Sequence, residues 1–312
     1  MTLEQMNYVV VLAEELSFTN ACLRLHITQP ALSQSIKGLE KQLGVLLFRR
    51  TTSAISLTYA GEQFVQAARS ILETNRNLLS KLEDISNLER GRLIIGVPNF
   101  RGQIILSKTI PAFRKRYPNI ELSVVEENTE RLLEITEKGL VDLSIMNRPE
   151  STSLLTVVPI CDERILVASP PDHPLCAGTD PGNQDFSDLP GIPVSKLRDE
   201  PFIILRGGHK LRETTEKLFR EKGLGKNIAL EVNNLPTAQQ LVANGLGFTF
   251  IGEMAARYVV QSPRPVFFRL LDAAPTHSIV AAYKTGSYLS HTTTAYLRLV
   301  RDTFSNLESF RQ

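Results

Sequence analysis

The sequence predicts a multidomain α+β protein built from an N-terminal winged helix-turn-helix, one long linker helix and a C-terminal α/β domain. Three observations predict this order. Residues 17–58 form two short amphipathic segments and a basic, β-branched tail, residues 59–89 repeat apolar side chains without a proline, and residues 90–312 alternate strand and helix patterns. A chain of 312 residues with 42% hydrophobic and 22% charged residues is long enough for several domains with their own cores.

The two short helices have recognisable beginnings. Ser17 or Thr19 can cap the first helix, and Thr28 before Gln29-Pro30 predicts the N-cap of the second, with proline in its first turn. Apolar residues of the second helix recur at spacings of three and four, which predicts one buried stripe. This stripe consists of Leu32, Ile36, Leu39 and Leu43.

The opposite face of the second helix carries short hydrogen-bonding side chains in its first half. Such a face suits the major groove of DNA, because Gln can pair with adenine through two hydrogen bonds and Lys can reach guanine or a phosphate. The alternative is an ordinary solvated face. After this helix, residues 46–58 predict a hairpin or wing whose basic root lies against phosphates. The predicted DNA-contacting residues are Thr28, Gln29, Pro30, Ser33, Gln34, Lys37, Arg49, Arg50 and Thr51.

Residues 59–89 predict a single long helix that pairs with another helix. Its apolar positions alternate spacings of four and three, as in a coiled-coil seam, and Asn75 is a polar interruption of a kind that commonly fixes register or partner number. The alternative is that Asn75 packs against the chain's own N-terminal domain. The predicted dimerisation residues are Phe64, Ala68, Ile71, Asn75, Leu78, Leu82 and Ile85.

From residue 90 onward, strands and helices alternate, which favours an α/β sheet. Strands are predicted at 92–97, 121–126, 141–146, 154–160, 164–168, 202–205, 228–232 and 248–251. A helix that ends at Phe113 is predicted after the first strand, and further helices at 129–138, 211–222 and 236–244. Residues 169–193, rich in proline, glycine and aspartate, predict a surface excursion between two alternating units.

The N-terminal residues are similar to those of the LysR-type transcriptional regulators. The similarity extends in order over most of the first 61 residues and continues, with looser motifs, over essentially the whole chain. The residues that carry it are Leu3-Glu4-Gln5, Phe18-Thr19, Ala21, Leu25, Thr28-Gln29-Pro30-Ala31-Leu32-Ser33, Ile36, Leu39-Glu40, Leu43-Gly44, Leu47-Phe48-Arg49-Arg50, Leu57-Thr58 and Ala60-Gly61.

The resemblance implies three domains: a DNA-binding domain at 1–58, a dimerising linker helix at 59–89 and an effector-binding domain at 90–312. The last is expected to be two-lobed and of periplasmic-binding-protein type, with lobe I at 90–162 and 267–312, lobe II at 163–266, and crossings near 161–164 and 266–269. Ligands of such folds settle outside strand ends near helix N-termini, where free N–H groups favour anions. The expected effector-binding residues are Asn99, Phe100, Arg101, Thr129, Asn147, Arg148, Arg206, Gly208, His209 and Thr237.

The chain is therefore expected to be a sequence-specific transcription regulator whose activity responds to a small organic effector, of which an anion is one version. Its expected partners are double-stranded promoter or operator DNA, a second copy of itself in a dimer or tetramer, the effector and RNA polymerase, with no membrane, metal or cofactor. Overall charge is only +2, but the docking surface concentrates cations. These are Arg24, Lys37, Lys41, Arg49 and Arg50, against Glu40 alone.

Other function classes have weaker support. The sequence contains neither a nucleophile elbow nor zinc-ligand spacing, and its five histidines are scattered, so we expect no enzyme. Two alternatives stay open: a helix-turn-helix fused to a catalytic α/β domain, and a DNA-binding module with purely architectural contacts. Neither a signal segment nor an apolar run of membrane-spanning length is present, which predicts a cytoplasmic protein. Cys22, Cys161 and Cys176 are expected to be reduced thiols, with a redox pair of Cys161 and Cys176 as the alternative.

Overall fold

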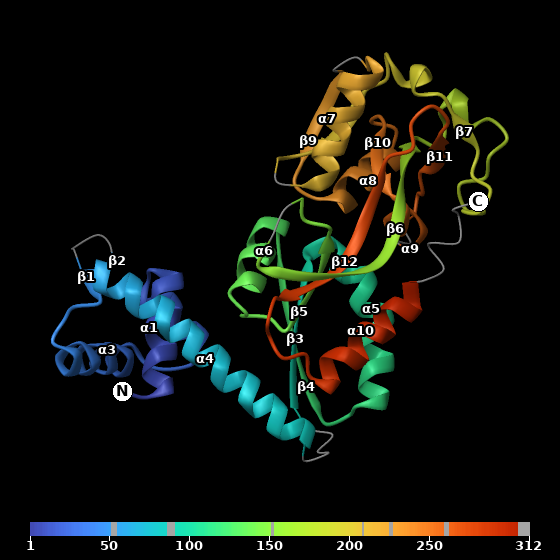
Figure 1. The fold of residues 1–312 in the computed structure, drawn as a ribbon. Coiled ribbons are helices and arrows are strands. Elements are labelled where there is room, and N and C mark those ends of the chain that lie inside the picture. Colours follow the sequence, from blue (N-terminus) through green and yellow to red (C-terminus); the bar gives the residue numbers. More distant parts are fainter. Residues whose placement is uncertain are drawn as a thin grey trace. The chain divides into compact units, whose positions relative to one another are not determined.

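A computed structural model describes residues 1–50, 55–85, 91–150, 153–207, 209–224, 227–258 and 262–304 of the chain. It divides into two compact units, residues 1–87 and 88–312 (Figure 1). Three of the predicted sites fall partly outside this description. Thr51 and Gly208 are not among the described residues, and the side chains of Arg50 and Ile85 are not described either.

The N-terminal unit is a winged helix-turn-helix. Its three short helices are α1 (Leu3–Glu15), α2 (Phe18–Leu25) and α3 (Gln29–Leu43). The wing consists of the antiparallel strands β1 (Phe48–Arg50) and β2 (Ile55–Leu57), in which Phe48 pairs with Leu57 and Arg49 with Ser56. The long helix α4 (Tyr59–Ile85) follows directly. The predicted order of elements is thus confirmed for this unit of the chain.

The helix ends follow local capping chemistry. Ser17 caps α2 by accepting a hydrogen bond from the Asn20 N–H. Thr28 occupies the N-cap of α3 as predicted, but its side chain makes no capping hydrogen bond, and Pro30 lies in the first turn instead. Gly44 ends α3 in the left-handed region at φ 72°, which glycine adopts without a Cβ penalty.

Three residues of the predicted α3 stripe form the centre of this unit, because Leu32, Ile36 and Leu39 are completely buried. The prediction is wrong for Leu43, of which 37% is exposed. It is the last helical residue, where the chain already turns away toward Gly44. The buried Glu40 ties the helix to the wing, since its carboxylate accepts hydrogen bonds from the N–H groups of Leu47 and Phe48 at 2.8 and 3.1 Å.

Helix α4 uses its first half to pack against its own domain. Val65 and Ala68 are buried in the core with α1, and Leu72 is partly buried beside them. Arg69 reaches Glu14 of α1, whose side chain is only 5% exposed, at 3.0 Å. The N-terminal part of the predicted seam is therefore occupied within the chain.

Lobe I of the C-terminal unit begins with the strands β3 (Gly91–Pro98), β4 (Ile120–Glu127) and β5 (Leu143–Asn147), which run parallel in the order β4-β3-β5. Helices α5 (Asn99–Arg116), α6 (Thr129–Glu137) and α10 (His291–Phe304) cover the sheet. Both faces of β3 are buried, because Leu93 and Ile95 join the core with α5 and α10 while Ile94 joins that of α6.

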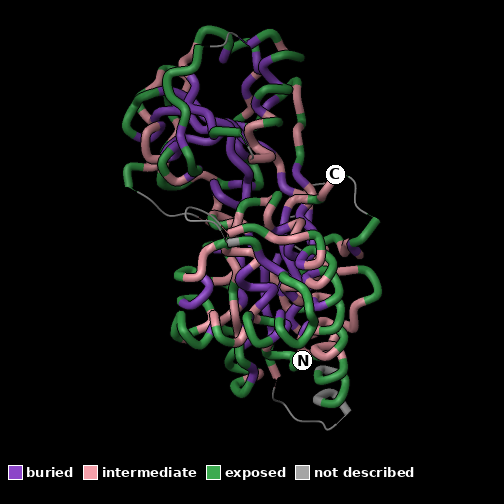
Figure 2. The backbone as a smooth tube through the Cα atoms, turned by 90° about the vertical axis from the view of Figure 1, so that its left-hand side faces the viewer, coloured by how far each residue is buried: buried purple, intermediate pink, exposed green. Residues whose placement is uncertain are grey.

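In lobe II the same eight-stranded sheet continues through β10 (Thr249–Gly252), β11 (Val266–Leu270) and the short β7 (Gly191–Ile192). A separate two-stranded sheet is formed by β8 (Phe202–Leu205) and β9 (Ile228–Val232). Strands β8 and β9 are parallel, and a bridge from Phe202 to Phe248 connects them to the β10 segment. Helices α7 (Lys210–Lys222), α8 (Leu235–Ala243) and α9 (Glu253–Tyr258) complete the lobe, with 3-10 turns at Pro174–Cys176 and Val194–Leu197. Buried residues run through the strands of both lobes (Figure 2).

Two long strands join the lobes. The strands predicted at 154–160 and 164–168 are one continuous strand, β6 (Leu155–Ser169), which pairs with β12 (Thr276–Lys284) in its first part and with β10 and β11 in its second. The first crossing thus lies near 161–164, as expected. The second does not lie at 266–269, because β11 pairs within lobe II, and the start of β12 at 276–279 makes this crossing instead. A register shift between Ile279 and Val280 marks it.

Candidate functional site

The first half of α3 presents the side chains expected to contact DNA. Gln29, Pro30, Gln34 and Lys37 are exposed, and Ser33 is half-buried. Since Leu32 and Ile36 hold the opposite side of the helix in the core, this polar face points away from the domain, as a groove-reading face must. Thr28, at the helix start, is exposed as well, and its hydroxyl is not used in capping.

The wing adds an exposed Arg49 on β1. Arg24, at the end of α2, is held by acidic side chains of α1, at 2.8 Å from Glu14 and 3.1 Å from Glu15. Part of its charge is thus neutralised within the domain. Among the described side chains of the docking surface, Lys37, Lys41 and Arg49 are exposed and have no ion pair.

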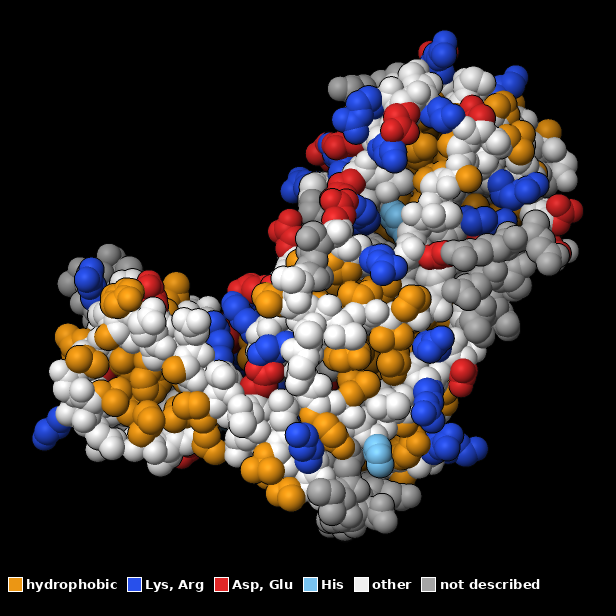
Figure 3. Space-filling model, in the orientation of Figure 1, with side chains coloured by type: hydrophobic (Ala, Val, Ile, Leu, Met, Phe, Trp, Pro, Cys, Tyr) orange, Lys and Arg blue, Asp and Glu red, His pale blue; other side chains and the backbone are white. Residues whose placement is uncertain are grey.

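From Ile71 onward, α4 has an exposed apolar surface. Ile71, Leu78, Leu79 and Leu82 are each between 42% and 53% exposed, whereas Asn75 is half-buried. In Figure 3, apolar side chains also gather over the α1 and α3 part of the N-terminal unit. Exposed apolar residues at helical spacing are typical of a helix that meets a partner.

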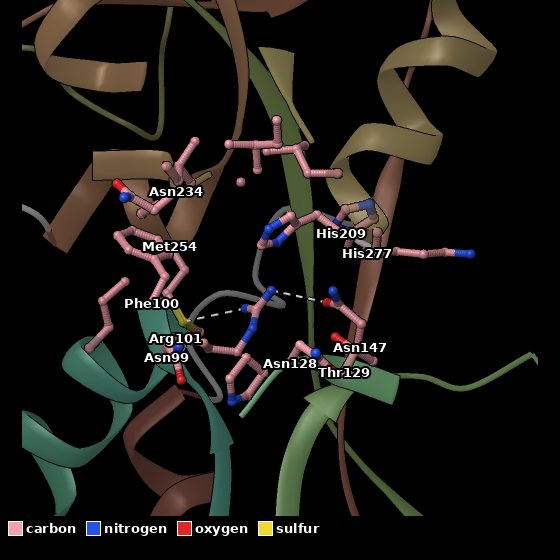
Figure 4. A pocket seen from close by; sticks show the side chains of 18 of the residues that line it. Asn99, Phe100, Arg101, Asn128, Thr129, Asn147, His209, Asn234, Met254 and His277 are labelled. Atoms are coloured by element: carbon pink, nitrogen blue, oxygen red, sulfur yellow. Dashed lines mark hydrogen bonds between the residues drawn. The ribbon is translucent and has the colours of Figure 1, made fainter. Parts of the chain in front are cut away.

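A pocket of about 970 Å³, counting its open mouth, lies between the lobes of the C-terminal unit (Figure 4). Its walls follow the carboxyl ends of three parallel strands of lobe I and two parallel strands of lobe II. These wall segments are residues 98–101 after β3, 127–129 after β4, Asn147 at the end of β5, Leu205 at the end of β8 and 233–235 after β9. This is where ligands bind in open α/β sheets, because the loops at these strand ends diverge.

Arg101 of α5 lies in the middle of the pocket (Figure 4). Its Nη2 donates to Glu163 Oε1 at 2.8 Å and to Asn147 Oδ1 at 3.0 Å, and its Nη1 lies 3.8 Å from Met254 Sδ. The Glu163 side chain is 2% exposed and also accepts a hydrogen bond from the Met254 N–H. A Cβ at Gly252 would lie 2.7 Å from Glu163 Oε2, so only glycine leaves room for this carboxylate. The Arg101 charge is therefore neutralised inside the pocket.

Several helix N-termini surround the pocket. Asn128 caps α6 and Asn234 caps α8, each accepting a backbone N–H with its side-chain oxygen. Helix α5 starts after Pro98 and α7 after His209, neither with a side-chain cap. The pocket thus has free backbone N–H groups and the unused amide NH₂ groups of the capping asparagines.

Two further titratable groups are fixed at the wall. His277 of β12 shares a hydrogen bond of 2.8 Å with the Thr214 hydroxyl, and burial lowers the pKa of His277 to about 4, so the ring is neutral near pH 7. Lys210 of α7 contacts Glu150 and Glu213 at 2.6 and 2.7 Å, and these hydrogen bonds raise its pKa. Both groups are engaged by neighbours on the protein.

Six of the expected effector residues line the pocket: Asn99, Phe100, Arg101, Thr129, Asn147 and His209. Arg148, Arg206 and Thr237 are exposed and do not belong to the pocket wall, so the structure does not bring them together with these six residues. No local sequence signal marks Glu163 or His277, which sit opposite each other in the β6–β12 pairing. The residues that sequence reasoning missed include Glu127, Glu163, Lys210, Asn234, Met254 and His277.

The cysteines of the described residues are isolated from one another. All three cysteines are buried and none forms a disulfide, and burial raises the pKa of the Cys176 thiol. Cys161 and Cys176 belong to different core clusters. Within the described ranges there is neither a group of three or more His, Cys, Asp or Glu side chains placed to hold a metal nor a helix long and apolar enough to cross a membrane.

Two family models match the chain. Residues 3–62 match the bacterial regulatory helix-turn-helix of the lysR family, and residues 86–305 match the LysR substrate binding domain. The two matches fall on the winged helix-turn-helix and on the two-lobed domain that contains the pocket.

Relatives and solved structures agree with this division. The HTH-type transcriptional regulator YcgK of Bacillus subtilis is 32% identical over 97% of this chain and 94% of its own length. The DNA-binding transcriptional dual regulator OxyR of Escherichia coli is 28% identical over 93% and 91%. The C199D variant of full-length OxyR of Pseudomonas aeruginosa has a TM-score of 0.72 at 25% identity, covering 100% and 99% of the two chains. CbnR in complex with its target DNA shares the fold, with a TM-score of 0.64 at 20% identity, over 97% and 100%.

Proposed function

Because the chain belongs to the LysR-type family of transcriptional regulators, we propose that it reads its operator with α3 and the wing and binds a small organic effector in the pocket between its lobes. The chain is a DNA-binding transcription regulator with an effector-binding domain. The position of the pocket carries the proposal that an effector binds between the lobes, because the pocket walls come from the carboxyl ends of strands in both lobes.

The DNA contacts divide into two kinds. Gln29, Ser33 and Gln34 read base edges, whereas Arg49 and Arg50 hold phosphates and fix the register of the helix on the duplex. The exposure of Gln29, Gln34 and Arg49 supports this division.

Assembly uses the exposed apolar surface of α4 that begins at Ile71. Ile71, Leu78 and Leu82 follow the predicted seam and are uncovered in the single chain. Pairing two chains through this surface gives two recognition helices for two half-sites. We propose a dimer or tetramer that binds operator DNA in the cytoplasm and contacts RNA polymerase from there.

The effector acts by changing the angle between the lobes, which shifts the spacing of the paired DNA-binding domains and the bend of the DNA. Such a change requires that the effector bind the two arrangements with different affinity. Solution scattering of the protein on its operator tests this step, because identical shapes with and without effector, despite a transcriptional response, would contradict it.

We propose reversible binding rather than catalysis. The described pocket wall contains neither serine nor cysteine, its Lys210 and Glu163 are held in ion pairs, and its His277 is hydrogen-bonded to Thr214. In the alternative of a fused catalytic domain, incubation converts the bound molecule. Recovery of unchanged ligand after prolonged incubation supports the regulator, and a product supports the enzyme.

Signal reception does not depend on cysteine chemistry in this proposal. Several relatives are named hydrogen peroxide-inducible genes activators, but Cys161 and Cys176 here are buried in separate clusters. A buried thiol with a raised pKa is a slow nucleophile toward oxidants. The double variant C161S/C176S is therefore expected to keep the response of the wild-type protein.

The decisive experiment is a footprint on the DNA beside the protein's own gene, repeated with the metabolites of the neighbouring genes' products. A protected site that changes with one metabolite supports the proposal. Equal affinity for this DNA and for random duplex at fixed salt would support purely architectural binding instead.

A further inference from the structure

The charged groups of the pocket are already paired with one another or balanced in sign. Its wall has two cationic side chains, Arg101 and Lys210, and two carboxylates, Glu127 and Glu163. Arg101 is bound to Glu163, and Lys210 is bound to two further carboxylates just outside the wall. The formal charge of these four wall residues is therefore zero, and both cationic side chains are held by carboxylates.

An anion would meet unfavourable neighbours at the most obvious anchor. To reach the Arg101 guanidinium, a ligand carboxylate would have to approach Glu163, which is 2% exposed and held by the Met254 N–H. Like charges sharing a poorly solvated site repel strongly. An anion would also be repelled near the uncapped start of α5. Glu127 lies beside Pro98 in the β3–β4 register, lines the pocket and has no ion pair in the described structure.

The uncharged groups of the pocket point to ligand oxygens. The side-chain oxygens of Asn128, Asn147 and Asn234 are occupied by donors of the protein, which leaves their NH₂ groups for a ligand. The free backbone N–H groups at the starts of α5 and α7 add more donors. A cationic ligand would bring donors of its own to a pocket already rich in them.

We infer that the effector is an uncharged organic molecule rich in oxygen acceptors, such as carbonyl or hydroxyl oxygens, with an apolar part that contacts Phe100, Leu205 and Leu235. This inference rests on the proposed function, because it names the ligand class of the same pocket. It replaces the anionic version of the effector that the sequence suggests. Glu163 acts as a specificity-determining residue, since its charge cancels that of Arg101 and so removes the attraction for anions.

The test uses the full chain and a small-molecule extract of its native cells, separated at pH 7 into molecules retained by an anion exchanger, molecules retained by a cation exchanger and molecules retained by neither. Each fraction is added to the protein, and the melting temperature and the operator footprint are measured. We expect a shift with the unretained fraction. A shift with only a retained fraction would overturn the inference but leave the regulator function intact, and no shift with any fraction would overturn both.

Variants provide a second reading of the same inference. E163Q keeps the size of the side chain but leaves the Arg101 charge uncompensated, so it should bind benzoate, used as a plain anionic probe, at least tenfold more tightly than wild type does. E127Q, at the pocket edge, should change benzoate affinity in the same direction if E163Q does not fold. The exposed E130Q, outside the wall, serves as the matched control and should match wild type. Unchanged benzoate affinity in folded E163Q or E127Q would contradict the inference.

Discussion

Arg69 of the linker helix α4 donates a hydrogen bond of 3.0 Å to Glu14 of α1, and this carboxylate also holds Arg24 of α2 at 2.8 Å. One buried acid therefore ties the linker helix to both helices beneath it. The apolar contacts of Val65 and Ala68 are not directional, whereas the guanidinium–carboxylate pair restricts the rotation of α4 about its own axis.

Breaking this contact should destabilise the N-terminal unit. In R69M, Glu14 loses one partner while staying largely buried, and we expect a decrease of about 2 kcal/mol in the free energy of unfolding, since breaking a buried pair leaves an uncompensated charge. Urea unfolding followed by circular dichroism measures it. R24M removes a partner of the same carboxylate that is 46% exposed and should cost less. A greater decrease in R24M would show that the α4 contact has no special role.

Two substitutions should separate base reading from phosphate binding. Q29A should narrow the difference in affinity between operator and random DNA, because it removes a side chain that hydrogen-bonds a base edge. R49A should weaken binding to both DNAs by a similar factor and reduce the salt slope by about one unit for each phosphate that it leaves without a cationic partner. Fluorescence anisotropy at several salt concentrations distinguishes the two effects. The same drop in selectivity in both variants would refute this assignment.

The exposed half of α4 should control assembly. Leu78 is 53% exposed in the single chain, so L78D costs the isolated fold little but places a charge in an apolar seam between two chains. We expect L78D to be a monomer, and light scattering after gel filtration measures its molar mass. L46D, at a comparably exposed leucine of the turn before the wing, is the control and should remain a dimer. Persistence of the dimer in L78D would place the interface elsewhere.

His277 should make stability fall in acid. Its pKa is about 4 in the folded chain against an ordinary value of 6.5, so the unfolded chain takes up the proton first as the pH drops. The contribution is fully present above pH 6.5 and is lost progressively toward pH 4, with a total of about 3 kcal/mol. Urea unfolding of wild type and H277N between pH 4 and 7.5 tests this. An equally steep decline in H277N would assign the acid sensitivity to other groups.

A buried amide offers a stabilising substitution. Gln239 of α8 is completely buried, and neither atom of its amide group has a hydrogen-bond partner in the described structure. Q239M keeps the side-chain length and removes the unpaired polar atoms, which should raise the free energy of unfolding by about 1 kcal/mol. The neighbouring Q240M, at a half-buried position, should change it little. A destabilised Q239M would indicate an ordered water at the amide.

Local patterns are sufficient to predict the N-terminal unit and the starts of most helices. The α3 stripe, the wing and the unbroken α4 depend on spacing and capping within a few residues, which a sequence displays directly. Leu43 is the exception, since its exposure depends on how the chain leaves the helix at Gly44.

The crossing strands are harder to predict because their partners are distant in sequence. Three consecutive charged residues, 162–164, look like a break between two strands. Each has a partner far away in the sequence: Asp162 accepts a hydrogen bond from Ser278, Glu163 pairs with Arg101, and Arg164 pairs with Glu253. The same distance hides Glu163 and His277 from a site predicted by sequence. In the sequence, Arg148 and Arg206 look like ligands for an anion because they follow predicted strands. Both are exposed outside the pocket wall, whereas Arg101 lines it, and only the tertiary structure shows this difference.

The ribbon of β6 and β12 sets how the two lobes are able to move. β6 is one hydrogen-bonded strand of 15 residues, roughly 50 Å at the usual rise, and pairs with β12 at one end and with β10 and β11 at the other, so neither lobe can separate from it without losing ladder hydrogen bonds. A two-stranded ribbon yields most easily in torsion, and the irregular pairing at Ile279 and Val280 is a soft point in it. If the effector binds between the lobes as proposed, the lobes would thus turn relative to each other as a rotation about the long axis of this ribbon.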